Sequence, residues 1–271
     1  MSLFNFNQEE LLSFFAVLIR YSVLFAILPF VGDKSVPGPT KILLALATTI
    51  ALFPALVSNG GVKPGDAMVW GASASGIIST ITLEILFALA LGFVARIIFD
   101  AILMGGNLVG NFMGFSIAST YDAHQESQTQ VVAQVQMTLA MLIFLVLDGH
   151  HLMLRAALDS YRVVGVGSLN IGLGTAFVTK LIELSGNVIR FGLEIAAPVA
   201  ISLFAVNVAF GVLAKAMPQL NILVLSFAAS GLIGLGVLFL SLPEFQGLVG
   251  NYLSQIGDWM EAVTVLMAKG T

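Results

Sequence analysis

The sequence predicts an all-α protein of the polytopic membrane class, and three observations support that fold class. Of the 271 residues, 58% are hydrophobic and only 10% are charged, whereas soluble domains average about 45–50% and about 25%. The charges are spaced so that long uncharged runs remain, among them Ala101–Tyr121 and Ala216–Pro243. These runs do not alternate apolar and polar residues as membrane barrel strands do, so we expect helices, for which about 20 residues cross a bilayer.

Helix breakers and polar residues separate the expected helices. Pro29 and Gly32 end the first, Ser58–Gly61 closes the second, and the polar residues 116–136 follow the third. The Gly-rich stretch Gly165–Gly174 precedes the last group of helices. The third segment is too long for one crossing, so we expect it to bend, to break or to be two helices. The expected helices are Leu11–Val31, Lys41–Val57, Ala67–Asn111, Val131–Leu147, His150–Arg162, Ala176–Ala216, Leu220–Leu242 and Phe245–Leu266.

Composition also restricts the possible functions. The net charge is −4 and there is no basic run, which argues against a nucleic-acid partner. The absence of cysteine excludes disulfides, cysteine zinc sites and iron–sulfur clusters. No catalytic, cofactor-binding or metal-binding motif is apparent. We therefore expect neither an enzyme nor a cofactor or metal.

Seven charged residues lie inside the apolar stretches and need protein or water around them. Exposure of all seven to lipid would cost roughly 20 kcal/mol, at about 2.5–3.5 kcal/mol each. Arg96 and Asp100 are four residues apart on one helix face, which predicts an intrahelical ion pair. The seven are Arg20, Glu84, Arg96, Asp100, Glu183, Arg190 and Glu194.

Five polar residues recur at steps of three and four and predict one polar face on a helix. We call them the polar seam: Lys180, Glu183, Asn187, Arg190 and Glu194. Within one chain, the simplest interpretation is internal ion pairing that lets the helix pack. We predict that the seam is a buried assembly surface or an internal lock of this kind, the alternative being a hydrated pathway.

A glycine repeat and a histidine pair also attract attention. Gly106, Gly110 and Gly114, here called the glycine ridge, recur every four residues, which favours close approach of another helix. Asp148-Gly-His-His151 is the most enzyme-like cluster, but adjacent histidines should project in different directions from a helix and make a poor shared metal site. A hydrated helix end is the simpler interpretation.

The strongest candidate site is the segment that follows the glycine ridge and contains the polar residues Ser119–Gln130. Its first half, Phe115–Tyr121, combines small and bulky groups suited to sealing a narrow opening. Its second half, Asp122–Gln130, can stay hydrated. We therefore predict a closure element in a pore, the alternative being an ordinary solvated loop.

Taken in order, the sequence resembles the R component (FliR) family of the flagellar type III secretion export gate. Matching blocks are Pro29–Gly32 with Val36-Pro37, Glu84–Gly92, Met113–Ala118 with Asp122, Asp148–His151 with Asp159–Tyr161, and Ala197–Val199 with Gly211 and Met217–Asn221. The family usually has Asp-Pro where this chain has Asp122-Ala123, so the turn should be less rigid here.

The resemblance implies a structural subunit in the bacterial inner membrane, at the flagellar basal body. It implies a helical hetero-oligomeric pore with P and Q subunits, serving unfolded rod, hook and filament proteins together with the A and B components. It further implies a P-like portion, residues 1–172, and a Q-like hairpin with a C-terminal helix, residues 173–271. The plug loop would cover about residues 115–126, with the gating positions Phe115, Ile117, Thr120, Tyr121 and Asp122.

Two other functions compete with this interpretation. A secondary transporter would use the polar seam as its pathway, but usually carries an internal repeat, which is not found. An intramembrane hydrolase would use Asp148 and His150, but the remaining catalytic groups are missing. The proteins that co-purify with a tagged chain would distinguish these three functions.

Overall fold

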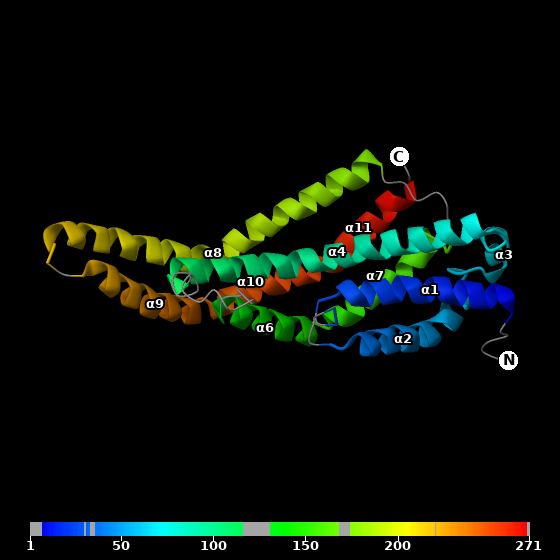
Figure 1. The fold of residues 1–271 in the computed structure, drawn as a ribbon, viewed down its shortest axis with the longest axis horizontal. Helices are drawn as coiled ribbons and strands as arrows, with labels where there is room; N and C mark the ends of the chain where they lie inside the picture. Colours follow the sequence, from blue (N-terminus) through cyan, green and yellow to red (C-terminus); the bar gives the residue numbers. More distant parts are fainter. Residues whose placement is uncertain are drawn as a thin grey trace. The chain divides into compact units, whose positions relative to one another are not determined.

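The computed structural model describes residues 7–29, 31–32, 36–115, 131–167, 174–219 and 221–269, and within these ranges every regular element is a helix (Figure 1). The all-α prediction is thus confirmed for the described chain. The elements are α1 (Gln8–Ile27), α2 (Gly38–Ser58), η1 (Pro64–Asp66, a 3₁₀ turn), α3 (Ala67–Trp70), α4 (Ala74–Phe112), α6 (Val131–Val146), α7 (Gly149–Val163), α8 (Thr175–Ala216), α9 (Ile222–Leu240), α10 (Leu242–Ser254) and α11 (Ile256–Lys269).

The first two helices begin and end where local chemistry allows. Glu9 and Glu10 occupy the first turn of α1, where negative charge is favourable beside the positive end of the helix dipole. The helix ends at Ile27, earlier than the expected Val31. Leu28 leaves the helical region with ψ near 134°, and the Gly32 N–H donates to its carbonyl at 2.7 Å. A proline in its first turn opens α2, as its fixed φ permits.

The long third segment breaks near its start and nowhere later. The short α3 ends at Trp70, and Ser73 then caps α4, accepting the Gly76 N–H on Oγ at 3.1 Å. From there α4 runs for 39 residues, or about 58 Å at 1.5 Å per residue. That length exceeds the roughly 30 Å hydrocarbon core of a bilayer.

The C-terminal segment differs from the prediction. One helix was expected over Phe245–Leu266, whereas the structure has two, α10 and α11, which meet at Gln255. Both are amphipathic, and each packs its apolar side on a different partner: α10 lies against α6, and α11 lies against α7. Two packing partners explain a break that the apolar pattern alone does not reveal.

The helices form two compact units. Unit 1 comprises residues Met1–Arg96, Asp148–Leu184 and Gln255–Thr271; in it α1 packs on α2 and α3, and α7 packs on α2 and α11. Unit 2 comprises Ile97–Leu147 and Ser185–Ser254, and in it α10 packs on α6 and α9. The predicted P-like and Q-like portions divide the chain differently, by family pattern rather than compactness, and stay a prediction.

Several helices satisfy the requirements for crossing a membrane. Four of the described helices are long and apolar enough, namely α1, α2, α4 and α8. The number rises to six if two bent pairs each count as one span: α6 with α7, bent by 65°, and α9 with the α10–α11 segment, bent by 58°. Length and composition therefore agree with the membrane class that the sequence predicts.

Candidate functional site

The glycine ridge lies in unit 2, where α4 passes between α6 and α8. A Cβ atom added to Gly106 would lie 2.4 Å from the Ala133 Cα of α6, so the two backbones approach closely there. One residue earlier, a Cβ on Gly105 would lie 2.9 Å from the Ile195 side chain of α8. Gly105 is not part of the predicted ridge. A spacing of four residues identifies glycines on one face of a helix, whereas α4 packs against other helices on two faces.

The other two ridge glycines behave differently. Gly110 is buried on α4. Gly114 lies beyond the helix in a turn, with φ +85°, a conformation that other residues rarely adopt. A Cβ there would also lie 2.9 Å from the Phe227 ring of α9. The last ridge position therefore ends α4 and turns the chain, instead of extending the helix face.

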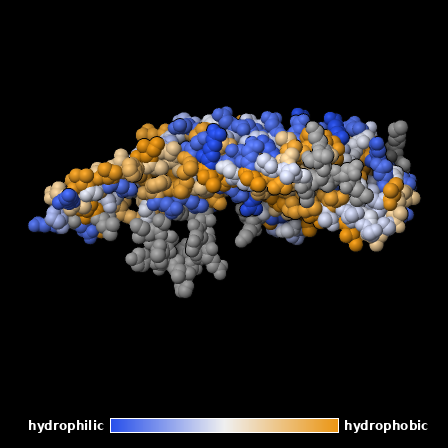
Figure 2. All heavy atoms as spheres, turned by 90° about the horizontal axis from the view of Figure 1, so that it is seen from above, coloured by the Kyte–Doolittle hydropathy of each residue, from blue (hydrophilic) through white to orange (hydrophobic). Residues whose placement is uncertain are grey.

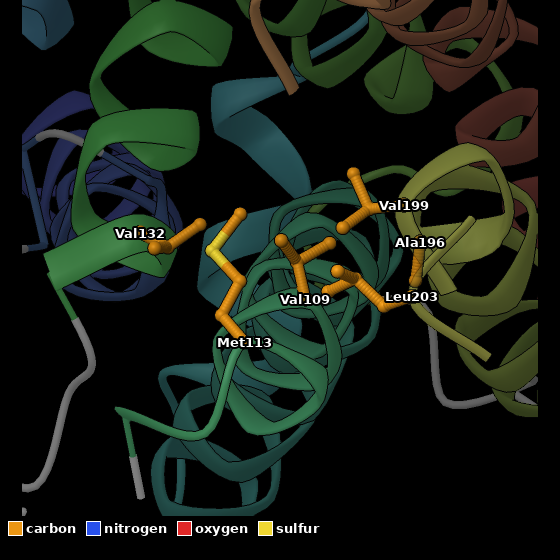
Figure 3. Packing of buried hydrophobic residues seen from close by; sticks show 6 residues of the cluster. All are labelled: Val109, Met113, Val132, Ala196, Val199 and Leu203. Carbon is orange, nitrogen blue, oxygen red and sulfur yellow. The ribbon is translucent and has the colours of Figure 1, made fainter. Parts of the chain in front are cut away.

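A buried apolar cluster holds the end of α4 in place (Figure 3). Val109 of α4 and Met113, the residue directly after α4, point toward Val132 of α6 on one side and toward α8 on the other. The cluster consists of Val109, Met113, Val132, Ala196, Val199 and Leu203, and Phe115 packs partly buried against it. Each fully buried aliphatic side chain stabilises the fold by about 1.5–3 kcal/mol, so the point where the predicted plug loop leaves α4 is firmly anchored.

Most of the predicted plug residues lie outside the described chain. Phe115 is the last described residue before that gap. Ile117, Thr120, Tyr121 and Asp122 fall within 116–130, so the structure leaves their assignment as a prediction. What it adds is the rigid base from which that loop begins.

The polar seam lies along α8 and forms ion pairs within the helix. Lys180 Nζ donates to Glu183 Oε1 at 2.8 Å, and Arg190 Nε donates to Glu194 Oε1 at 2.8 Å. Glu183 and Arg190 are exposed in the chain by itself, whereas Lys180, Asn187 and Glu194 are half-buried. Internal pairing thus occurs, and much of the seam remains accessible to another subunit; its role as a buried seam stays a prediction.

A residue that the sequence reasoning missed completes one end of the seam. The Tyr252 hydroxyl of α10 donates to the second carboxylate oxygen of Glu194, and its ring stacks on Phe191 with centroids 3.7 Å apart. Both oxygens of the Glu194 carboxylate are therefore engaged. A tyrosine 58 residues away carries no local sequence signal that would have identified it.

Arg20 and Glu84 form a buried ion pair in unit 1. Arg20 Nε donates to Glu84 Oε2 at 2.5 Å and Nη2 donates to Oε1 at 3.0 Å. The two side chains are only 1% and 3% exposed. The pair joins α1 to α4, so these two of the seven intramembrane charges face protein, as expected.

Other groups surround the remaining donors and the faces of the guanidinium. Nη1 donates to the Ser160 hydroxyl at 3.1 Å, and the carbon of the guanidinium lies 3.8 Å from the Tyr161 ring centroid and 4.5 Å from that of Phe87. Arg20 therefore fastens α1, α4 and α7 together. The sequence identified both charges as requiring partners but could not pair residues 64 positions apart.

The remaining sequence candidates lie on helix surfaces. Arg96 is exposed and Asp100 half-buried on α4, and their ion pair stays a prediction. Asp148, His150 and His151 are exposed around the start of α7, as a hydrated helix end requires. The expectation that the two histidines diverge is wrong, because their ring centroids are 4.2 Å apart.

The hairpin of α8 and α9 carries an apolar surface that this chain leaves uncovered (Figure 2). Phe204 is 68% exposed, Leu232 is 78% exposed and Phe239 is 73% exposed. Isolated soluble proteins rarely expose contiguous apolar surface on this scale. The hairpin therefore needs lipid or another subunit around it.

The model of the family described as bacterial export proteins, family 1, matches residues 11–256. The chain belongs to this family. The match spans both units and includes the glycine ridge, the polar seam and the Arg20–Glu84 pair, so these features lie inside the family fold.

Curated relatives carry the name flagellar biosynthetic protein FliR. The Escherichia coli protein is 28% identical over 243 residues, covering 90% of this chain and 89% of the relative. The Pectobacterium carotovorum protein is 28% identical over 98% of this chain and 99% of its own length. The Bacillus subtilis protein is 26% identical over 94% and 95%. The predicted membership of the FliR family is confirmed.

Proposed function

We propose that this member of the FliR family is a structural subunit of the flagellar type III protein export gate. In this proposal it forms part of the pore through which unfolded rod, hook and filament proteins cross the bacterial inner membrane. The family match supports the role in export. The observation that carries the subunit role is the exposed apolar hairpin of α8 and α9, because an apolar surface of this size needs lipid or another subunit against it.

The partners proposed are the P and Q subunits, with the A and B export components acting on the same gate. Subunits packed side by side would bury the apolar hairpin and would also enclose the polar seam, where Arg190 is exposed in the chain by itself. A buried ion pair can fix register between subunits. The chain should accordingly be unstable or aggregated when purified without partners, and a folded monodisperse monomer unchanged by their co-expression would contradict this.

The plug loop is proposed to close the pore. Its support is the anchored end of α4: Gly114 turns the chain at a fixed place and Phe115 packs on the apolar cluster. A loop that starts from a rigid base can seal an opening while its tip remains free to move. A seal that opens repeatedly should be held by only a few kcal/mol.

The test is a pair of five-residue deletions in the same loop. Deleting Ile117–Tyr121 should leave the complex assembled but make the membrane permeable to ions or small molecules. Deleting Ala123–Ser127, the polar half, is the matched control and should add far less conductance. A strain lacking Ile117–Tyr121 that assembles, exports and shows no added conductance would refute the plug.

A further inference from the structure

Three side chains that can bind a metal ion meet at the turn that leads into α7. One nitrogen of His150, one nitrogen of His151 and one carboxylate oxygen of Asp148 all lie within 4.8 Å of one another. The His151 Nδ1 and Asp148 Oδ1 atoms are 3.4 Å apart. All three residues belong to unit 1, and neither the polar seam nor the plug loop uses them.

The arrangement of the two histidines removes the objection that their sequence raised. Consecutive residues of a helix point about 100° apart, so two adjacent imidazoles were not expected to share an ion. In the structure the ring centroids are 4.2 Å apart and the ring planes are inclined by 38°. Both rings therefore project on the same side of the first turn of α7.

The spacing of the ligand atoms suits direct coordination. Zn²⁺ binds imidazole nitrogen and carboxylate oxygen tetrahedrally at about 2.0–2.2 Å, which places two ligand atoms of one ion about 3.3–3.6 Å apart. The distance between His151 and Asp148 falls in that range. The His150 nitrogen, at no more than 4.8 Å from the other two atoms, reaches the same range by rotation about its side-chain bonds.

The backbone holds the three ligands in place. The Asp148 carbonyl accepts the N–H groups of His151 at 2.9 Å and of Leu152 at 3.2 Å, so helical hydrogen bonds close the turn that carries the side chains. Gly149 and Met153 are buried, which fixes the opposite face of this turn inside unit 1. Ligands on a pre-organised turn lose less conformational freedom when they bind.

The surroundings allow a cation to enter and to stay hydrated. The His151 and Asp148 side chains are 72% and 74% exposed in the chain by itself. Two positive features oppose the ion: the start of α7 is the positive end of a helix dipole, and the exposed Arg155 follows His151 by four residues. An exposed helix end changes affinity by about fivefold at most, whereas Asp148 places a full negative charge at the same end.

We propose that Asp148, His150 and His151 bind a divalent transition-metal ion, Zn²⁺. Imidazole together with carboxylate favours Zn²⁺ over Mg²⁺, which prefers oxygen ligands alone. Three protein ligands leave the fourth tetrahedral position to water. The ion ties the turn after α6 to the first turn of α7, where the chain passes from unit 2 to unit 1. The proposal does not rest on the role of the chain in export.

Calorimetric titration of Zn²⁺ tests the proposal on the full chain with its co-purifying subunits. The affinity tag must contain no histidine, and a chelator first removes bound metal. Asp148→Asn, His150→Gln and His151→Gln should each weaken one Zn²⁺ site per copy of this chain by at least about tenfold, since even groups that only orient a ligand contribute 10–100-fold. Mg²⁺ should bind the same site at least about tenfold more weakly than Zn²⁺.

A matched control and a second readout complete the test. Asp159→Asn alters another carboxylate of α7, one that is 47% exposed and paired with Arg162, and should change Zn²⁺ affinity less than about twofold. Co²⁺ bound to the wild-type chain should give the visible absorption of a tetrahedral site, and His151→Gln should abolish it. Equal Zn²⁺ binding by the wild type and the three ligand variants, equal affinity for Mg²⁺, or no Co²⁺ absorption that depends on His151 would overturn the proposal.

Discussion

Removing the charge of Glu84 should destabilise unit 1 severely while barely changing the shape of the side chain. In Glu84→Gln, the guanidinium of Arg20 keeps its place but loses the carboxylate that accepts two hydrogen bonds at 2.5 and 3.0 Å. The Arg20 side chain is 1% exposed, so water cannot replace the lost partner. Breaking a buried pair from one side costs about 3–5 kcal/mol, and we expect a loss of unfolding free energy in that range.

The double variant Arg20→Met, Glu84→Met distinguishes the penalty of leaving one charge unpaired from the net contribution of the ion pair to stability. It replaces both charges by apolar groups of similar length, and no uncompensated charge remains in the core. Exchanges of this kind are often neutral or stabilising, although here Arg20 also contacts Ser160 and two aromatic rings. We expect the double variant to be more stable than either Arg20→Met or Glu84→Met alone.

Chemical unfolding of the full chain in mild detergent, with its co-purifying subunits, measures these differences. Arg162→Met is the control, because it breaks an ion pair with Asp159 whose side chains are 62% and 47% exposed, and such pairs contribute about 0–1 kcal/mol. A Glu84→Gln variant that unfolds with the wild-type midpoint would refute the claim that Arg20 fastens α1, α4 and α7 together. So would a double variant less stable than both single variants.

Two further predictions follow from the helix contacts. Gly106→Ala should destabilise the chain by about 1–3 kcal/mol through overpacking, since its Cβ would lie 2.4 Å from the Ala133 backbone. The control Gly186→Ala places its Cβ where nothing lies within 4 Å, so it should stabilise the chain slightly through helix propensity. Thermal unfolding that ranks the two variants the other way would contradict the packing. Arg190→Glu should reduce recovery of the complex in affinity purification, because it places a second negative charge beside Glu194 at the polar seam; normal assembly combined with abolished export would favour a hydrated pathway.

The helix pattern of the sequence carried most of the fold. Apolar length and helix breakers predicted the bounds of α1, α2, α8 and α9 to within a few residues, because they are local signals; α4 begins at Ala74 and not at the expected Ala67, because the segment breaks after Trp70. The break of the C-terminal segment at Gln255 was not predictable in the same way. It depends on α10 and α11 packing on different helices, which is a property of the tertiary structure.

The site residues divide along the same line. Arg20 and Glu84 could be recognised as charges in need of partners, since the cost of a lone charge is a property of each residue. Their pairing across 64 positions and the donation from Tyr252 to Glu194 are long-range geometry. No spacing rule encodes them.

The central claim, that this chain works as one subunit of a hetero-oligomeric gate, is tested most directly by its partners. A tagged full chain is solubilised in mild detergent, purified once and analysed by native mass spectrometry, with the co-purifying proteins identified from peptides. We predict one assembly that contains this chain together with P-type and Q-type export subunits. Its measured mass should require those subunits and should not be a whole multiple of the mass of this chain. A stable monomer or homo-oligomer without those subunits, recovered from cells that express them, would contradict the claim.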